Sequence, residues 1–320
     1  MRTRRPIARL AARSLAPASI LVVAAGALSL ASPSASATAA PTHQPAQAAA
    51  TVWPTTGVGV RAPLTKPKFK ATPVHPEKLS HPGADTMGKV TAAHAPWGMS
   101  HHARPTSAAT VPQLPGIDVS SFQGDLNWAS LAPSLDFSYA KATEGTYYTN
   151  PDFANQYNGP FNSGLIRGAY HFGIPNNSQG QTQADYFISH GGGWSADGHT
   201  LPGVLDIEYN PYGAECYGLT QAQMVTWLHN FVNEYDFREG VFPVIYSTTD
   251  WWTTCTGNNA GFGSEDPLWI ANYSAAHGGT LPNGWSFYTF WQYADSGSLP
   301  GDQDVFNGAL SQLQLIATKG

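Results

Sequence analysis

A short apolar run, residues 204–209, carries two carboxylates at alternate positions, Asp206 and Glu208. Because residues two apart in a strand project from the same face, these side chains would lie side by side, roughly 6–7 Å apart along the chain. Each acid of such a pair alters the proton affinity of the other, as paired acid and base chemistry requires. The pattern also fits an exposed edge strand whose acids face water, because a strand buried on both faces of a parallel sheet normally reads as a continuous apolar run without acids.

Further acids stand at the ends of other predicted strands: Asp118, Glu144, Asp302 and Asp304. In a barrel of alternating strands and helices, functional side chains lie at the C-terminal ends of the strands, where these acids would meet. A face with several acids and almost no Lys or Arg is unsuited to a phosphate or carboxylate ligand. It suits glycoside hydrolysis, in which one acid protonates the leaving oxygen and another stabilises the oxocarbenium ion.

Aromatic side chains at the same strand ends are suited to stacking on sugar rings. They are Tyr170, Tyr246, Tyr273 and Trp291, and each also fits an ordinary core or rim position. His171 is interpreted as a structural, hydrogen-bonding residue rather than a base. The chain has no Gly-rich phosphate loop, no Gly-x-Ser-x-Gly elbow and no His-Glu-x-x-His helix, so we expect no cofactor and no metal.

Strand-like runs recur from residue 116 onward and must position these side chains. They cover 116–120, 137–142, 166–172, 204–209, 241–247, 268–273, 286–293 and 304–306. The early runs alternate with helical patterns, whereas Gly/Pro-rich loops too short for full helices separate the last ones. This order predicts an α/β fold over residues 114–320, a shortened and irregular TIM-like barrel of eight strands.

The helices between the early strands are indicated mainly by their caps. Asn150 followed by Pro151 places a cap residue before a proline at the first helical position. Thr220 with Gln223 is a capping box, and a helical apolar spacing follows it. A third helix is predicted around 181–188.

Charge divides the chain into two chemically different parts. Residues 1–113 hold 12 Lys/Arg and 2 Asp/Glu, whereas residues 114–320 hold 4 and 19. The acidic second part would repel a phosphate backbone, so we expect no nucleic-acid partner. In the first part, residues 1–40 combine a basic leader, an apolar stretch and small-residue cleavage sites, which predicts a secretory signal peptide. We therefore expect a secreted protein, or a wall-associated one, with no membrane span after export.

Residues 41–113 are rich in Pro, Ala, Thr and His and have no sustained hydrophobic period. They are interpreted as a linker or propeptide rather than a folded module. The chain has two cysteines, Cys216 and Cys255, and an even pair in an exported protein predicts one disulfide. Zinc is not expected at this spacing, because no histidine pair lies nearby.

Six motifs in order carry a specific resemblance. They are GIDVSSFQG at 116–124, YAKATEG at 139–145, GAYHF at 168–172, LDIE at 205–208, WIANY at 269–273 and WQY at 291–293. Together they resemble glycoside hydrolase family 25, the Ch-type lysozymes, over residues 114–318. The resemblance implies a flattened (β/α)5(β)3 barrel that lacks helices after its last strands. It also implies cleavage of the β-1,4 bond from N-acetylmuramic acid to N-acetylglucosamine in bacterial peptidoglycan, in some members including 6-O-acetylated muramic acid.

The same resemblance implies roles for individual acids. Glu208 corresponds to the general acid, and Asp206 either stabilises the oxocarbenium ion or orients the 2-acetamido group of the substrate. Asp118 corresponds to a third acid that lines the cleft. The fourth is assigned to Asp302, with Asp304 as the alternative on the same face. Glu144 and Tyr170 match residues near the sugar-binding groove.

Three alternatives remain open at this stage. An N-acetylglucosaminidase would use similar chemistry, and a chitinase-like hydrolase also places an Asp-x-Glu pair at a strand end. The chitinase signature needs further aspartates upstream, where this chain has 203–205, Gly-Val-Leu. A non-catalytic wall-binding module is the third alternative. We expect a monomer whose partner is bacterial peptidoglycan.

Overall fold

The structure is a computed structural model that describes Met87 and residues 111–320. All of these residues belong to the compact unit Trp53–Gly320. The signal peptide predicted at 1–40 and nearly all of the linker predicted at 41–113 therefore lie outside the described residues. No helix in the described part of the chain combines the length and apolar character needed to cross a membrane.

Nine strands form one sheet within residues 111–320, and β1 pairs with β2 as well as β9, so that all strands except β3 form a closed ring. The ring contains β1 (Gln113–Val119), β2 (Phe137–Glu144), β4 (Ile166–Phe172), β5 (Val204–Asp206), β6 (Val244–Ser247), β7 (Leu268–Ala271), β8 (Phe290–Ala294) and β9 (Asp302–Asn307). The short β3 (Tyr148–Thr149) pairs only with β2. Neighbouring strands of the ring are parallel except β9, which is antiparallel to both β1 and β8.

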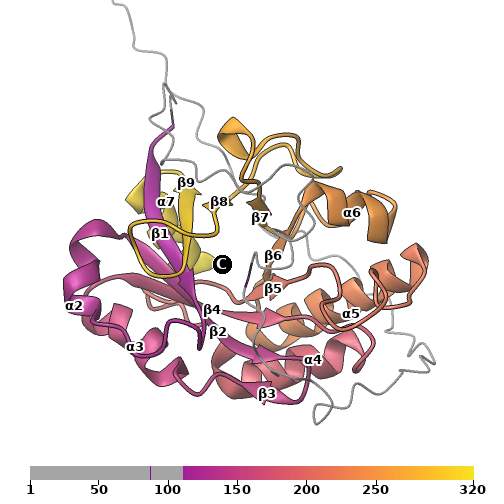
Figure 1. Ribbon diagram of the computed structural model, residues 1–320, viewed down its shortest axis with the longest axis horizontal. Coiled ribbons are helices and arrows are strands. Elements are labelled where there is room, and N and C mark those ends of the chain that lie inside the picture. Colours follow the sequence, from indigo (N-terminus) through magenta and orange to yellow (C-terminus); the bar gives the residue numbers. More distant parts are fainter. Residues whose placement is uncertain (1–86, 88–110) are drawn as a thin grey trace, which may run out of the picture. The chain divides into compact units, whose positions relative to one another are not determined.

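Helices follow the early strands and are largely missing after the later ones (Figure 1). The early connections contain α2 (Trp128–Leu131) with the short turn η2 (Ala132–Ser134), α3 (Phe153–Asn162), α4 (Gly180–Phe187) with η3 (Ile188–Gly192), α5 (Gln221–Glu239) and α6 (Thr249–Thr256). From β7 to β9 the described chain has only the short turn η4 (Ala276–Gly278), and α7 (Leu310–Lys319) follows β9. The predicted TIM-like barrel with helices lacking after its last strands is confirmed.

Two helix starts were predicted from caps, with different outcomes. The capping box is present at α5, where Thr220 accepts from the backbone N–H of Gln223 and the Gln223 side chain returns to Thr220. The start predicted at Asn150 and Pro151 was wrong, because α3 begins at Phe153. Asn150 instead accepts a hydrogen bond from the backbone of Asp152, which forms a turn before the helix.

Two glycines make room for rings inside the barrel. A Cβ atom on Gly116 would lie 2.2 Å from the ring of Phe137, and one on Gly168 would lie 2.0 Å from the ring of Tyr139. No real Cβ contact is that short, so these strand positions require glycine. Phe137 and Tyr139 can therefore fill the barrel from neighbouring β2.

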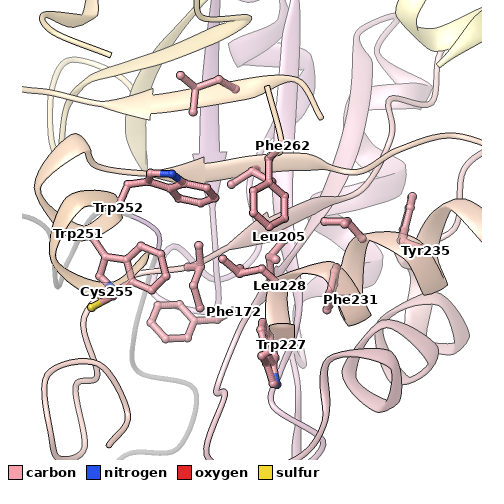
Figure 2. Close-up of a cluster of buried hydrophobic side chains, with 14 of the residues drawn as sticks. Phe172, Leu205, Trp227, Leu228, Phe231, Tyr235, Trp251, Trp252, Cys255 and Phe262 are labelled. Carbon is pink, nitrogen blue, oxygen red and sulfur yellow. The ribbon is translucent and has the colours of Figure 1, made fainter. Parts of the chain in front are cut away.

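The apolar side chains form two main clusters, one inside the ring and one between the ring and its helices. The inner cluster includes Tyr170, Val204, Tyr246, Trp269 and Phe306, together with Leu313, Ile316 and Ala317 of α7. The outer cluster joins Phe172 and Leu205 of the sheet to residues of α5 and α6, among them Trp227, Phe231 and Trp252 (Figure 2). Residues of β7 alternate between the two clusters, with Trp269 and Ala271 in the inner one and Leu268 and Ile270 in the outer one, so one face of this strand is dedicated to the barrel interior.

The predicted disulfide is present. Cys216, in the connection between β5 and α5, is bonded to Cys255 of α6, with Cα atoms 5.5 Å apart. The bond closes a loop with a sequence separation of 39 residues. It thereby ties the segment that follows Glu208 to the outer helix layer. Tyr209 reinforces this link, because its hydroxyl donates to Asp250 of α6 at 2.6 Å.

Replacing both cysteines is expected to lower the free energy of unfolding by up to about 4 kcal/mol, because the unfolded chain regains the entropy of an open loop. The variant is Cys216→Ser with Cys255→Ser, which leaves no free thiol, and the measurement is urea unfolding followed by tryptophan fluorescence. Wild-type protein unfolded under reducing conditions is the matched control and should give the same midpoint as the variant. Equal urea midpoints for the double variant and the oxidised wild type would show that the disulfide adds no stability.

Candidate active site

Three barrel strands bring acids to one end of the ring. Asp206 is the last residue of β5, and Glu208 follows it by two residues. Asp118, near the end of β1, lies directly opposite Asp302 in the antiparallel register. Because β9 is antiparallel to its neighbours β1 and β8, its first residue, Asp302, lies at the end of the barrel where the parallel strands have their C-termini. We call Asp118, Asp206, Glu208, Asp302 and Asp304 the acid cluster.

The register separates the two candidates for the fourth acid. Asp304 lies opposite Gly116, one inward-facing position deeper in the barrel than Asp302. The exposed fraction of Asp302 is 8%, whereas that of Asp304 is 1%. Both side chains face the interior, as the alternation predicts, and Asp302 is the one nearer the strand ends. Its assignment as the fourth acid therefore stays the preferred prediction.

Gln292 of β8 links the acid cluster to two tyrosines. Its amide nitrogen donates to Asp118 at 2.7 Å and to Asp302 at 3.2 Å. Its amide oxygen accepts from the hydroxyls of Tyr246 at 2.7 Å and Tyr273 at 2.5 Å. All four bonds are buried, so they fix the orientation of the amide and hold two carboxylates at a set separation.

The electrostatics of the acid cluster favour protonated carboxyl groups. Burial raises the pKa of Asp118 to about 7; the hydrogen bond from Gln292 opposes this rise and the charge of Glu208 adds to it. Burial, and then the charge of Glu208, also raise the pKa of Asp206 well above its usual range. The pKa values of Asp302 and Asp304 are raised by burial and by the charge of Asp118. Like charges in a dry site cannot all ionise, which is the setting in which a carboxylic acid donates a proton near neutral pH.

Asp118→Asn is expected to make the protein more stable than the wild type at pH 8 and about equally stable at pH 4. The raised pKa of Asp118 means that its stabilising contribution is complete below the unfolded-state pKa of about 4 and is lost as the pH rises through about 7. Each pKa unit corresponds to about 1.4 kcal/mol, so the gain at pH 8 should reach a few kcal/mol. Urea midpoints at pH 4, 6 and 8 measure it. A variant less stable than the wild type at pH 8 would contradict this electrostatic account.

A buried ion pair lies beside the acid cluster. Lys141 of β2 contacts Glu144 with its Nζ atom 2.6 Å from a carboxylate oxygen, and both side chains are fully buried. Glu144 also accepts hydrogen bonds from the hydroxyls of Tyr147 and Tyr212. The charge of Lys141 opposes the rise in the pKa of Asp206. Glu144 is therefore held by its own partners, and Lys141 favours the ionised form of Asp206 within the acid cluster.

The predicted sugar-stacking residues divide between the two clusters. Tyr170, Tyr246 and Tyr273 all belong to the inner cluster. Trp291 lies in the outer cluster, and its indole N–H donates to the backbone oxygen of Asn272 at 2.9 Å. The structure thus gathers the tyrosines on the side of the acids and places Trp291 on the opposite face of β8 from Gln292.

His171 has the surroundings of a structural residue. Its two ring nitrogens lie 2.8 Å from the Thr143 hydroxyl and 2.9 Å from the Gln183 side-chain oxygen. Burial lowers its pKa to about 3, so the ring is neutral across the working range of most enzymes. This arrangement agrees with the structural role expected for it. Within residues 111–320, no group of His, Cys, Asp and Glu side chains is arranged to hold a metal ion.

Sequence reasoning missed two residues of the site, Gln292 and Lys141. Both lie within the motifs already singled out, WQY and YAKATEG. The signal that would have found them is strand alternation: a polar residue between two aromatics, as in Trp291-Gln292-Tyr293, faces the barrel interior when its neighbours face the helices. Both carboxylate oxygens of Asp206 are buried without a close hydrogen-bond donor among the described residues, and the side chain of Glu208 is near enough to help raise the pKa of Asp206.

Comparison with known proteins agrees with this geometry. The sequence model of glycosyl hydrolases family 25 matches residues 117–302, more than half of the chain. The chain belongs to glycosyl hydrolase family 25. The matched span begins and ends on strands that carry the acid cluster. The expectation of a glycoside hydrolase of this family, drawn from six motifs, is confirmed.

Relatives of this family 25 hydrolase include both bacterial and fungal proteins. It is 44% identical over 262 residues to "Lysozyme M1" of Streptomyces globisporus, a match that covers 80% of this chain and 86% of that protein. It is 44% identical over 207 residues to "N,O-diacetylmuramidase" of Chalaropsis sp, covering 63% of this chain and 98% of that protein. Among solved structures, a muramidase from Acremonium alcalophilum is similar with a TM-score of 0.63 and 53% identity, over 65% of this chain and all of that one.

Proposed function

We propose that this family 25 hydrolase is a secreted lysozyme that cleaves the β-1,4 bond between N-acetylmuramic acid and N-acetylglucosamine in bacterial peptidoglycan. The observation that carries the proposal is the gathering of Asp118, Asp206, Glu208 and Asp302 at one end of the barrel. Relatives at 44% identity named lysozyme and N,O-diacetylmuramidase support the choice of substrate. The basic, then apolar leader over residues 1–40 supports export.

Glu208 is proposed as the general acid. It transfers its proton to the glycosidic oxygen while the bond from that oxygen to C1 of the muramic acid residue breaks, and the N-acetylglucosamine residue leaves with a new hydroxyl group. Positive charge develops on the sugar ring in this step, and ionised carboxylates nearby stabilise it. An electrostatic interaction with Glu208 contributes to the raised pKa values of Asp118, Asp206 and Asp302, which supports the place of Glu208 in the cluster.

Asp206 has two proposed roles, and each uses its buried carboxylate oxygens beside Glu208. As an ionised carboxylate it stabilises the oxocarbenium ion directly. As a hydrogen-bond acceptor it orients the N–H of the 2-acetamido group, so that the acetamido oxygen can attack C1 from the opposite side. Both roles require the ionised form of Asp206. The charge of Lys141 favours this form, because it opposes the rise in the pKa of Asp206.

The experiment is the incubation of purified, insoluble peptidoglycan with the protein, both as the full chain and after residues 1–110 have been cut off. The proposal predicts that soluble fragments and new reducing ends appear together as turbidity falls. A protein that sediments with the wall material but releases no reducing ends in either form would be a wall-binding module instead. Parallel digestion of chitin tests the chitinase-like alternative, for which reducing ends would appear from chitin at the same rate.

A further inference from the structure

We propose that Gln292 is a positioning residue of the hydrolase: its side-chain amide, oriented by two tyrosine hydroxyls, holds Asp118 as an ionised carboxylate in register with Asp302 during glycan cleavage. The proposal rests on the function proposed above, because a negative charge on Asp118 assists the reaction only if positive charge develops on a bound sugar ring. Gln292 needs no contact with the glycan, since it acts through the acids that it holds.

Gln292 projects into the barrel from β8. It lies opposite Asp304 in the antiparallel pairing of β8 with β9, and residues directly opposite each other share a face of the sheet. Trp291, its neighbour in sequence, belongs to the outer cluster. The exposed fraction of Gln292 is 0%, so both ends of its amide need hydrogen-bond partners within the protein.

The partners at the two ends of the amide determine its orientation. The amide oxygen accepts from the hydroxyls of Tyr246 and Tyr273, and the amide nitrogen donates to Asp118 and Asp302. Burial raises the pKa of both tyrosines well above the usual range, so their hydroxyls keep the protons that they donate. A reversed amide would place its oxygen against carboxylate oxygens, which cannot donate when ionised. The observed orientation is therefore the one that satisfies all four partners.

The amide nitrogen joins two acids from neighbouring strands. Asp118 of β1 and Asp302 of β9 lie opposite each other, and the two hydrogens of the amide nitrogen allow one bond to each acid, at 2.7 Å and 3.2 Å respectively. The shorter bond, to Asp118, favours the ionised carboxylate, because it opposes the rise in the pKa of Asp118 that burial causes. Gln292 thus offsets part of the cost of a negative charge in a buried site.

The backbone around Gln292 is fixed at the same end of the barrel. Its backbone oxygen accepts from the backbone N–H of Asn272 at 3.1 Å, and the indole N–H of Trp291 donates to the backbone oxygen of Asn272 at 2.9 Å. The pairing of β8 with β9 shifts register only after Gln292, between it and Ala294. The amide is therefore mounted on a regularly paired strand rather than on a loop, as precise positioning of two acids requires.

The pH dependence of the reaction separates positioning from a purely structural role. A buried glutamine that only stabilises the fold affects unfolding when it is replaced, and the pH dependence of catalysis stays the same. Loss of the donor to Asp118 would in addition raise the pKa of this acid further, so that the ionised form appears only at higher pH. One hydrogen bond to a charged group changes such an equilibrium about 10- to 100-fold, which corresponds to about one to two pH units.

Gln292→Met in the full chain tests the proposal, because methionine has a similar size and lacks both the amide donor and the amide acceptor. The kcat and KM values are measured with soluble peptidoglycan fragments between pH 4 and pH 9. The acid limb of the kcat profile, where Asp118 becomes protonated, should move up by about one to two pH units. At pH 6 kcat should therefore fall about 10- to 100-fold while KM stays the same. An acid limb at the wild-type position would overturn the proposal, however low the rate.

Gln183→Met is the matched control. Gln183 of α4 is also fully buried, and its side chain bonds to His171 and to the backbone of Ile174 in the helix layer. Its replacement should lower the urea midpoint and leave the pH profile of kcat unchanged. The same shift of the acid limb in Gln183→Met as in Gln292→Met would contradict the proposal, because lost stability alone would then move the limb.

A pair of milder changes serves if Gln292→Met fails to fold. Tyr246→Phe with Tyr273→Phe removes the hydroxyls that orient the amide and keeps both rings. The acid limb should move in the same direction by a smaller amount, since the amide nitrogen stays beside Asp118. A limb that does not move in this double variant would rule out the orienting role of the tyrosines.

A titration measures the same effect without turnover. 13C-carboxyl NMR of aspartate-labelled protein follows Asp118, whose signal is identified by its absence in Asp118→Asn. The midpoint should be about one to two pH units higher in Gln292→Met than in the wild type. If the wild type releases no reducing ends, the proposed hydrolysis fails, and the titration still decides whether Gln292 holds Asp118 in the ionised form. Equal midpoints would refute that role.

Discussion

Glu208→Gln should lower the rate of peptidoglycan cleavage by about 10²- to 10⁴-fold, the contribution of a positioned general acid. The amide keeps the shape of the carboxyl group but has no proton that it can transfer to the glycosidic oxygen. Because Glu208 is buried beside Asp206 in a cluster of acids, a neutral side chain of the same shape at this position should not destabilise the barrel. The rate is measured as the release of reducing ends from purified peptidoglycan.

Two comparisons make the Glu208 result specific. Glu265→Gln makes the same chemical change at an exposed position outside the acid cluster and should leave the rate unchanged. Sedimentation of Glu208→Gln with insoluble peptidoglycan should match that of the wild type, because the loss concerns the chemical step and not binding. Full activity in Glu208→Gln would show that another group donates the proton.

Lys141→Met should lower the free energy of unfolding by about 3–5 kcal/mol, the usual effect of removing one partner of a buried ion pair. The ammonium group lies 2.6 Å from the carboxylate of Glu144, and neither side chain has any exposed surface. Without Lys141, the hydrogen bonds that remain to this carboxylate from residues 111–320 come from the hydroxyls of Tyr147 and Tyr212. Methionine is similar in length, so little of the effect should arise from lost packing. The measurement is urea unfolding at pH 7.

The double variant Lys141→Met with Glu144→Gln is the matched control. It removes both charges, and the side-chain oxygen of the introduced amide can still accept from the tyrosines, so the double variant should recover much of the stability lost in Lys141→Met. The single variant should also lose activity, because the pKa of Asp206 rises further when the charge of Lys141 is gone. Equal stability of the single variant and the wild type would mean that Glu144 is not charged in the folded protein.

Local patterns predicted the strands best where side chains alternate between two buried surfaces. The run 166–172 coincides with β4, whose inner face supplies Tyr170 and whose outer face packs on helices. The run 204–209 was predicted too long, because β5 ends at Asp206. Pairing with β6 stops at the Asp206 and Tyr246 positions, and this limit is set by a neighbouring strand that is distant in sequence.

The acids of the site were predictable from their places at or near strand ends, whereas the depth of each acid in the barrel was not. Asp302 and Asp304 share a face in any strand, and only the register of β9 with β1 shows that Asp302 lies opposite Asp118. Gln292 escaped notice for a related reason, since its partners Asp118 and Tyr246 come from strands far away in the chain. Periodicity gives the face of a residue, and the closure of the barrel decides which residues meet on that face.

The proposed cleavage after N-acetylmuramic acid by the acid cluster leaves this sugar at the new reducing ends, so the identity of those ends decides between a lysozyme and a glucosaminidase. Peptidoglycan digested by the protein is reduced with borohydride, hydrolysed and examined by mass spectrometry. The proposed lysozyme should yield reduced muramic acid in proportion to the soluble material released, and Glu208→Gln should yield almost none. Reduced glucosamine at the new ends would contradict the assignment and identify the protein as an N-acetylglucosaminidase.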